Sequence, residues 1–210
     1  AFKTLTWLDQ HITTLEQQVS TPVFGHGPVE MGMPDWPTLL HRVSGDACYQ
    51  KLFAQAFKAE NGRISSRTVP EALAAFERTL ISRESLWDKA QQKKADLPED
   101  AQRGAALFFG SAHCASCHTG DVFSDQSFHV ITPNHPARVR TPSLRNVGVT
   151  APYLHDGSAP TLNAAIQAHT HSPAFSPMDE KALEAFLQTL TDQSFLHNPA
   201  LALPPESCPV

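Results

Sequence analysis

The residues most able to do chemistry stand together in the run Cys114-Ala115-Ser116-Cys117-His118. A Cys-x-x-Cys-His run is typical of the covalent attachment of a c-type haem. The two thiols can each form a thioether with one vinyl group of the porphyrin, and the neighbouring imidazole of His118 can bind the iron as proximal ligand. The spacing is strict because both sulfurs and the imidazole must reach one rigid, flat macrocycle.

Two other uses of the same residues are half of a zinc site and a redox-active dithiol. Zinc would need a second Cys/His pair nearby, and a thioredoxin-like dithiol would need a βαβ pattern around it. The sequence shows neither pattern, and it therefore favours one covalently bound haem c.

A haem iron held by His118 needs either a sixth ligand or an open position. The downstream candidates for that ligand are His129, His135, His155, His169, His171 and Met178. The last three lie at the end of one expected helix or the start of the next, from where a side chain can reach the opposite face of the ring. Periodicity alone does not choose among these three.

The composition of the whole chain excludes several classes of partner. The 210 residues are 41% hydrophobic and carry a net charge of −5, which suits one large domain or two small ones. No basic run marks a nucleic-acid or anionic-membrane surface, and no apolar stretch approaches the roughly 20 residues of a membrane span. Haem c is assembled outside the bacterial cytoplasm, so we expect a periplasmic protein.

The two cysteines outside the haem motif are Cys48 and Cys208. An oxidising compartment such as the periplasm allows them to form a disulfide. The sequence does not give the separation of their Cα atoms, and it leaves this pairing open.

The apolar pattern predicts an all-α fold. A helix is expected from Thr68 to about residue 85, with Pro70 in its first turn. Ser176 and Pro177 predict the start of a last helix, whose apolar face is Ala182, Leu183, Phe186, Leu187 and Leu190. Residues 119 to about 160 are dense in Pro, His and Ser and predict a long irregular segment that can wrap a haem edge. No segment alternates strongly enough to predict a sheet of any size.

Five sequence runs, taken together and in order, carry a family resemblance: Pro28-Val-Glu-Met-Gly32, Ala75-Phe-Glu-Arg-Thr-Leu80, Cys114–His118, Thr141-Pro-Ser-Leu-Arg-Asn-Val147 and Thr150-Ala-Pro-Tyr-Leu-His-Asp-Gly157. The chain resembles the bacterial dihaem cytochrome c peroxidase and MauG superfamily over nearly all of residues 1–195. Details around Trp7 and Pro22-Val-Phe-Gly25 are most similar to a MauG-like branch associated with methanobactin and copper-protein operons.

The resemblance implies two cytochrome c-like lobes with one haem each, whereas this chain has one attachment motif. Residues 1–95 would be the remainder of the N-terminal, peroxidatic lobe, and residues 96–210 the C-terminal haem domain, with the polar run 89–100 between them. Either the first haem is carried by a missing, cleaved or separate companion segment, or the protein is a single-haem relative.

The resemblance also assigns roles to single residues. Trp7 would relay electrons between the two haems. Gln18 and Glu30 would be the polar pair over the peroxide-binding iron, where a carboxylate can move a proton between the peroxide oxygens. Thr150 and Pro152 would offer backbone carbonyls to a calcium ion between the lobes, since calcium prefers oxygen ligands.

The distal ligand of the second haem is Met in the peroxidases and Tyr in MauG. Counted from Thr161-Leu162, this chain has His169 at that place. The resemblance therefore implies ligation by His118 and His169, with a lower potential than a His/Met haem and an iron closed to peroxide.

We expect an oxidoreductase that uses hydrogen peroxide, with this haem serving electron transfer. Peroxide is either reduced to water with electrons from a small redox protein, or used to oxidise Tyr or Trp side chains of a partner protein; closure of this haem by His169 favours the second version. The alternative is a single-haem cytochrome c that carries electrons and has no substrate of its own. A second haem with an open, high-spin iron would separate the two. A haem-bearing binding or assembly module is a third possibility, which the polar pair Gln18 and Glu30 disfavours.

Overall fold

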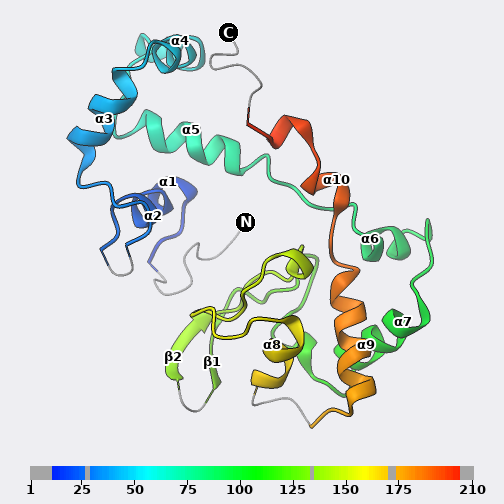
Figure 1. Cartoon of the computed structure of the whole chain (residues 1–210). Helices are drawn as coiled ribbons and strands as arrows, with labels where there is room; N and C mark the ends of the chain where they lie inside the picture. Colours follow the sequence, from blue (N-terminus) through cyan, green and yellow to red (C-terminus); the bar gives the residue numbers. More distant parts are fainter. Residues whose placement is uncertain (1–10, 27–28, 133–134, 170–173, 204–210) are drawn as a thin grey trace. The chain divides into compact units, whose positions relative to one another are not determined.

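The structure of the protein is a computed structural model that describes residues 11–26, 29–132, 135–169 and 174–203. Its chain forms two compact units (Figure 1). One unit contains residues 11–80, together with 199–203 near the end of the chain, and the other contains residues 81–198.

The unit of residues 11–80 is built from short helices joined by tight loops. Side-chain oxygens of Thr14, Asp35 and Asp46 accept backbone N–H groups at the starts of three of them, which satisfies donors that have no partner inside the helix. The α-helices are α1 (Leu15–Gln18), α2 (Ser20–Phe24), α3 (Trp36–Ser44), α4 (Ala47–Ala56) and α5 (Thr68–Glu77), and a 3₁₀ turn covers Lys58–Glu60.

Helix α5 begins at Thr68 as expected but ends at Glu77, well before residue 85. The hydroxyl of Thr79 donates to the Phe76 carbonyl at the end of the helix. Beyond it, the Ser82 hydroxyl and the Glu84 N–H both donate to the buried carboxylate of Asp192, at 3.2 and 2.9 Å. These bonds hold residues 82–84 against the end of the second unit, and a continuing helix could not make them.

The unit of residues 81–198 contains five α-helices and one hairpin among its described residues. They are α6 (Leu86–Gln91), α7 (Glu99–Phe109), β1 (Phe128–Thr132), β2 (His135–Arg140), α8 (Leu162–Ala168), α9 (Pro177–Gln188) and α10 (Gln193–Leu196), with 3₁₀ turns at Cys114–Ser116 and Val147–Val149.

Helices α7 and α9 pack face to face and form the centre of the second unit (Figure 1). Gly104 lies at their crossing, where an added Cβ would come within 1.9 Å of the Ala182 carbonyl oxygen. The core consists of Phe108, Ala112, Phe123, Leu162, Leu183, Phe186, Leu187 and Leu190. All five residues of the expected apolar face of the last helix are buried, so that prediction is confirmed.

The hairpin is a feature that the sequence analysis missed. Strands β1 and β2 pair antiparallel, with Phe128 opposite Arg140 and His129 opposite Val139. The fold is therefore mostly helical rather than all-α. The pairing is local, and β1 is rich in the β-branched and aromatic residues that favour extended chain, but a two-stranded ribbon has no long alternating pattern to reveal it.

The compact second unit begins near residue 81 and includes α6. The Trp87 N–H donates to the Thr189 carbonyl at the end of α9, at 3.1 Å. The next residue, Asp88, receives two hydrogen bonds from Arg145, at 2.9 and 3.0 Å. Burial opposes ionisation of this carboxylate, but the hydrogen bonds from Arg145 and Ser85 outweigh it and lower the pKa of Asp88.

No helix within the described part of the chain has the length and apolar character needed to cross a membrane.

Candidate haem site

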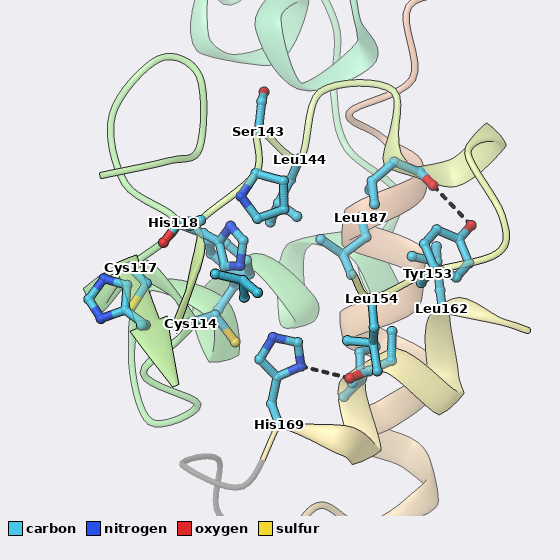
Figure 2. A pocket seen from close by; sticks show the side chains of 18 of the residues that line it. Cys114, Cys117, His118, Ser143, Leu144, Tyr153, Leu154, Leu162, His169 and Leu187 are labelled. Atoms are coloured by element: carbon cyan, nitrogen blue, oxygen red, sulfur yellow. Dashed lines mark hydrogen bonds between the residues drawn. The ribbon is translucent and has the colours of Figure 1, made fainter. Parts of the chain in front are cut away.

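A cavity of about 610 Å³ opens beside the core of the second unit (Figure 2). Its walls are largely apolar, which suits a flat hydrophobic ligand. Leu144, Leu154, Leu162, Ile166 and Leu187 supply much of this surface. The two cysteines and the histidine of the attachment motif line the same cavity.

The motif is held in a tight turn that directs its side chains into this cavity. Residues Cys114–Ser116 form a 3₁₀ turn, and the His118 N–H donates to the Cys114 carbonyl at 2.9 Å. Both thiols are free, and burial raises the pKa of Cys114 to about 11. Two sulfurs and an imidazole thus face one apolar space, which is the arrangement that covalent haem attachment requires.

The imidazole of His118 is fixed by a backbone hydrogen bond. Its Nδ1 lies 3.0 Å from the Phe123 carbonyl oxygen, so Nδ1 carries the proton and Nε2 is left as the acceptor. Burial lowers the pKa of His118 to about 4 and keeps the ring neutral. A neutral imidazole whose other nitrogen donates to a carbonyl is the form that ligates a metal.

His169 lies across the cavity and is fixed in the same way. It is the C-terminal cap of α8, whose first turn is capped by Thr161. Its Nδ1 lies 2.7 Å from the Ala165 carbonyl oxygen, one helical turn earlier (Figure 2). Its Nε2 is therefore the acceptor as well.

The separation of the two imidazoles fits one metal ion between them. Their ring centroids are 6.4 Å apart, with an interplanar angle of 60°. A metal–imidazole bond is about 2 Å and each nitrogen lies about 1.1 Å from its ring centre, so two axial imidazoles on one iron would have centroids about 6 Å apart. The pair is spaced for an iron while the cavity around it remains open, so these residues fit a haem.

Two of the remaining distal candidates, Met178 and His129, have other polar partners. Met178 is 62% exposed at the start of α9, and its sulfur lies 2.7 Å from a guanidinium nitrogen of Arg103. His129 lines the cavity, but its Nε2 bonds Asp125 at 2.7 Å. His155 also lines the cavity. His171 and the side chain of His135 lie outside the described residues.

The other expected site residues lie in the first unit, line the cavity, or fall outside the described residues. Gln18 ends α1 and is half-buried, and Glu30 is an exposed loop residue in the same unit. Trp7 lies outside the described residues, as does Cys208, whose pairing with Cys48 the sequence left open.

Thr150 and Pro152, two residues apart in the chain, both line the haem cavity. The Thr150 hydroxyl donates to the Val147 carbonyl at 3.2 Å. Among the described residues, one Cys/His/carboxylate group has atoms close enough to share a metal ion, and it consists of Cys117, Asp125 and His129, within 4.8 Å of one another.

Two polar features around the cavity could not be predicted from the sequence. One is the Asp125–His129 pair beside Cys117; the spacing of four residues in a segment expected to be irregular gave no signal for it. The other is the pairing of Arg145 with Asp88, 57 residues apart, which anchors the loop that carries Leu144. The run Thr141–Val147 singled out this loop in the sequence, but it did not identify Asp88 as the partner of Arg145.

Comparison with known proteins divides the chain between residues 96 and 101. A family model described as "Di-haem cytochrome c peroxidase" matches residues 1–96, and a cytochrome c model matches residues 101–194. The crystal structure of a MauG-like protein associated with microbial copper homeostasis superposes with a TM-score of 0.86 at 32% identity, over 97% of this chain and 76% of that one. The chain belongs to the dihaem cytochrome c peroxidase and MauG family.

Other relatives include MauG proteins and a cytochrome c peroxidase. The MauG proteins of Methylophilus methylotrophus and Methylorubrum extorquens are 33% and 32% identical to the chain, over 89% and 87% of its length. The cytochrome c peroxidase of Escherichia coli is 26% identical over 76% of it. The chain spans 63% and 59% of the two MauG proteins and 38% of the peroxidase. The dihaem peroxidase BthA of Burkholderia thailandensis, at 23% identity and a TM-score of 0.78, shares the fold.

Proposed function

We propose that the chain is the electron-transfer part of a peroxide-using dihaem oxidoreductase. The observation that carries the proposal is the pair of facing imidazoles 6.4 Å apart in the cavity that also holds both motif cysteines. Cys114 and Cys117 would hold the porphyrin covalently, and His118 and His169 would ligate the iron. The bound haem supplies one-electron redox chemistry.

The residues of the site have distinct tasks in this proposal. The carbonyls of Phe123 and Ala165 hold each histidine in the tautomer that presents Nε2. The apolar wall of Leu144, Leu162 and Leu187 excludes water from the ring. With both His118 and His169 bound to it, the iron would have no open position for peroxide, so the site would move electrons rather than oxygen atoms.

Peroxide chemistry then belongs to a second haem, which a companion segment carries. Gln18 and Glu30 are assigned to the polar side of that haem, with Glu30 as the proton-transfer group, and Trp7 to the electron path between the two haems. Thr150 and Pro152 are assigned to a calcium ion through their carbonyl oxygens. The expected compartment is the periplasm, because haem c is attached there.

Two versions of the activity follow from the relatives. In the peroxidase version a small redox protein supplies two electrons and peroxide is reduced to water. In the MauG-like version the oxidised haems remove electrons from aromatic side chains of a partner protein. The 32% identity with the MauG-like protein of copper homeostasis, over nearly the whole chain, favours the second version.

The alternative function is a single-haem electron carrier, which the single Cys-x-x-Cys-His motif of the sequence supports. The haem-to-protein ratio of the purified native protein, with intact masses of every chain present, separates the two. Two haems with one on a companion segment support the peroxide enzyme. One haem on a lone chain supports the carrier, and no covalent haem contradicts both.

A further inference from the structure

An aromatic cluster connects the haem cavity with the surface of α6. Its buried members are Phe108, Phe123 and Phe186, each no more than 3% exposed. Phe108 lines the cavity. The outer members are Phe109, which is 50% exposed, and Trp87, which is half-buried.

Trp87 is within two ring-to-ring steps of the cavity wall. Its ring stacks on Phe109 with centroids 5.5 Å apart and an interplanar angle of 25°, and it meets Phe186 edge-on at 5.2 Å. Phe186 in turn lies 5.0 Å from Phe108. A second route runs through Phe123, 6.2 Å from Trp87, whose carbonyl oxygen accepts the proton of His118.

The position of Trp87 is fixed from both sides. The backbone N–H of Trp87 donates to the Thr189 carbonyl. The neighbouring Asp88 is paired with Arg145, and both of these side chains are less than 15% exposed. An aromatic pair contributes about 0.5–1.5 kcal/mol beyond its burial, so packing alone accounts for an aromatic ring here. Of the five rings in the cluster, however, the indole is the one that can lose an electron at an accessible potential, and it stands at the outer end.

We propose that Trp87 is an electron-relay residue between the haem of this unit and a redox partner at the surface of α6. The inference rests on the proposed function, because it needs a haem in the cavity. The haem is first oxidised at the expense of peroxide, and Trp87 then gives it one electron. The partner next gives one electron to the oxidised Trp87 and restores the indole. No bond forms or breaks in either transfer, and the indole proton stays in place.

The test is photochemical electron transfer in the purified haem-containing protein. Gln91 is exposed and lies four residues after Trp87 in α6, so a ruthenium tris(bipyridine) complex attached through Q91C lies on the same side of the helix. Flash-quench oxidation of the complex removes one electron from Trp87, which then takes one electron from the reduced haem. Oxidation of the haem is followed by its absorbance.

The relay predicts that Trp87→Phe slows haem oxidation by about tenfold or more, equal to about 1.4 kcal/mol in the barrier. Trp87→Tyr should restore much of the rate, since a phenol can also be oxidised. With the complex on the exposed α9 residue through Lys181→Cys, Trp87→Phe should leave the rate unchanged.

If the protein with Trp87 and the Trp87→Phe variant oxidise the haem at equal rates with the complex at Q91C, the relay is wrong. It is also wrong if Trp87→Phe slows haem oxidation equally with the complex at either position. Haem content is measured on each sample by its pyridine haemochrome. Absence of haem would defeat the proposed function, whereas a haem-loaded protein with unchanged rates would defeat the relay alone.

Discussion

At the scale of residues, the site depends on two histidines, and in both the fold leaves Nε2 as the nitrogen that can bind a metal. Each Nδ1 is engaged by a backbone carbonyl, one from a loop at Phe123 and one from α8 at Ala165. Such outer hydrogen bonds set ring orientation and tautomer before a metal is bound. His169 faces His118 across the cavity, whereas Met178 lies exposed beside Arg103.

His169→Ala should convert the haem from low-spin to high-spin, because the sixth position of the iron would be vacated. Visible absorption and electron paramagnetic resonance of the oxidised protein measure the change. Met178→Ala is the matched control and should leave the spectrum as it is. A low-spin spectrum in His169→Ala that is lost only when Met178 is also removed would assign the ligand to Met178.

At the scale of elements, the cavity is framed by α7 and α9, which pack closely because residue 104 is glycine. Gly104→Ala places a methyl group against the Ala182 carbonyl, so the helices must separate. We expect a loss of about 1–3 kcal/mol in the free energy of unfolding, the usual effect of overpacking.

Chemical denaturation followed by circular dichroism measures this loss. Gly45→Ala is the control, since its Cβ would have its nearest contact at 3.2 Å and its φ is −74°. It should change the stability by less than about 1 kcal/mol. Equal effects of the two substitutions would contradict the close packing at Gly104.

The segment that enters the second unit is fixed by the buried carboxylate of Asp192, which is 1% exposed. Burial opposes its ionisation, but hydrogen bonds from Ser194, the Glu84 and Phe195 N–H groups and Ser82 lower its pKa to about 2, from 3.8. A pKa lower in the folded state than in the unfolded state stabilises the fold above about pH 4 and loses that contribution as the pH falls toward 2.

Asp192→Asn should therefore destabilise the protein at pH 7 by roughly 2 kcal/mol, and the difference from the native protein should shrink at pH 3. Urea unfolding at both values measures it. Asp96→Asn, at an exposed residue, should have no such effect. If Asp192→Asn lowers the free energy of unfolding equally at pH 7 and pH 3, the lowered pKa of Asp192 is contradicted.

The sequence predicted correctly those elements whose structure depends on residues close together in the chain. The cap at Ser176 and the apolar face of α9 are confirmed, since both depend on residues close in sequence. The end of α5, the packing of α6 and the hairpin depend on contacts made by Asp192, Thr189 and Arg140 from distant or non-periodic positions. Likewise the attachment motif was evident from spacing, whereas the facing of His169 and His118 needed the folded chain.

At the scale of the whole molecule, the chain has one attachment motif in a family described as dihaem, and it spans 63% of the Methylophilus methylotrophus MauG protein. Residues 11–80 form a compact unit of their own without such a motif. The peroxide chemistry proposed for Glu30 therefore depends on a haem that this chain does not attach.

Glu30→Gln should slow the reaction of the native two-haem protein with peroxide by about 10²-fold, the scale of a lost acid–base group. Stopped-flow absorbance measures the rate. Glu84→Gln, an exposed glutamate of the other unit, is the control and should react at the native rate. Native kinetics in Glu30→Gln would reduce Glu30 to a loop residue without a catalytic role.

The central claim is that this haem is closed by two histidines and transfers electrons. Near-infrared magnetic circular dichroism of the oxidised protein reports the axial pair directly, through the energy of the porphyrin-to-iron charge-transfer band. We predict the low-spin band of a bis-histidine haem. A band at the energy of His/Met ligation, or a high-spin spectrum with an open position, would contradict the claim.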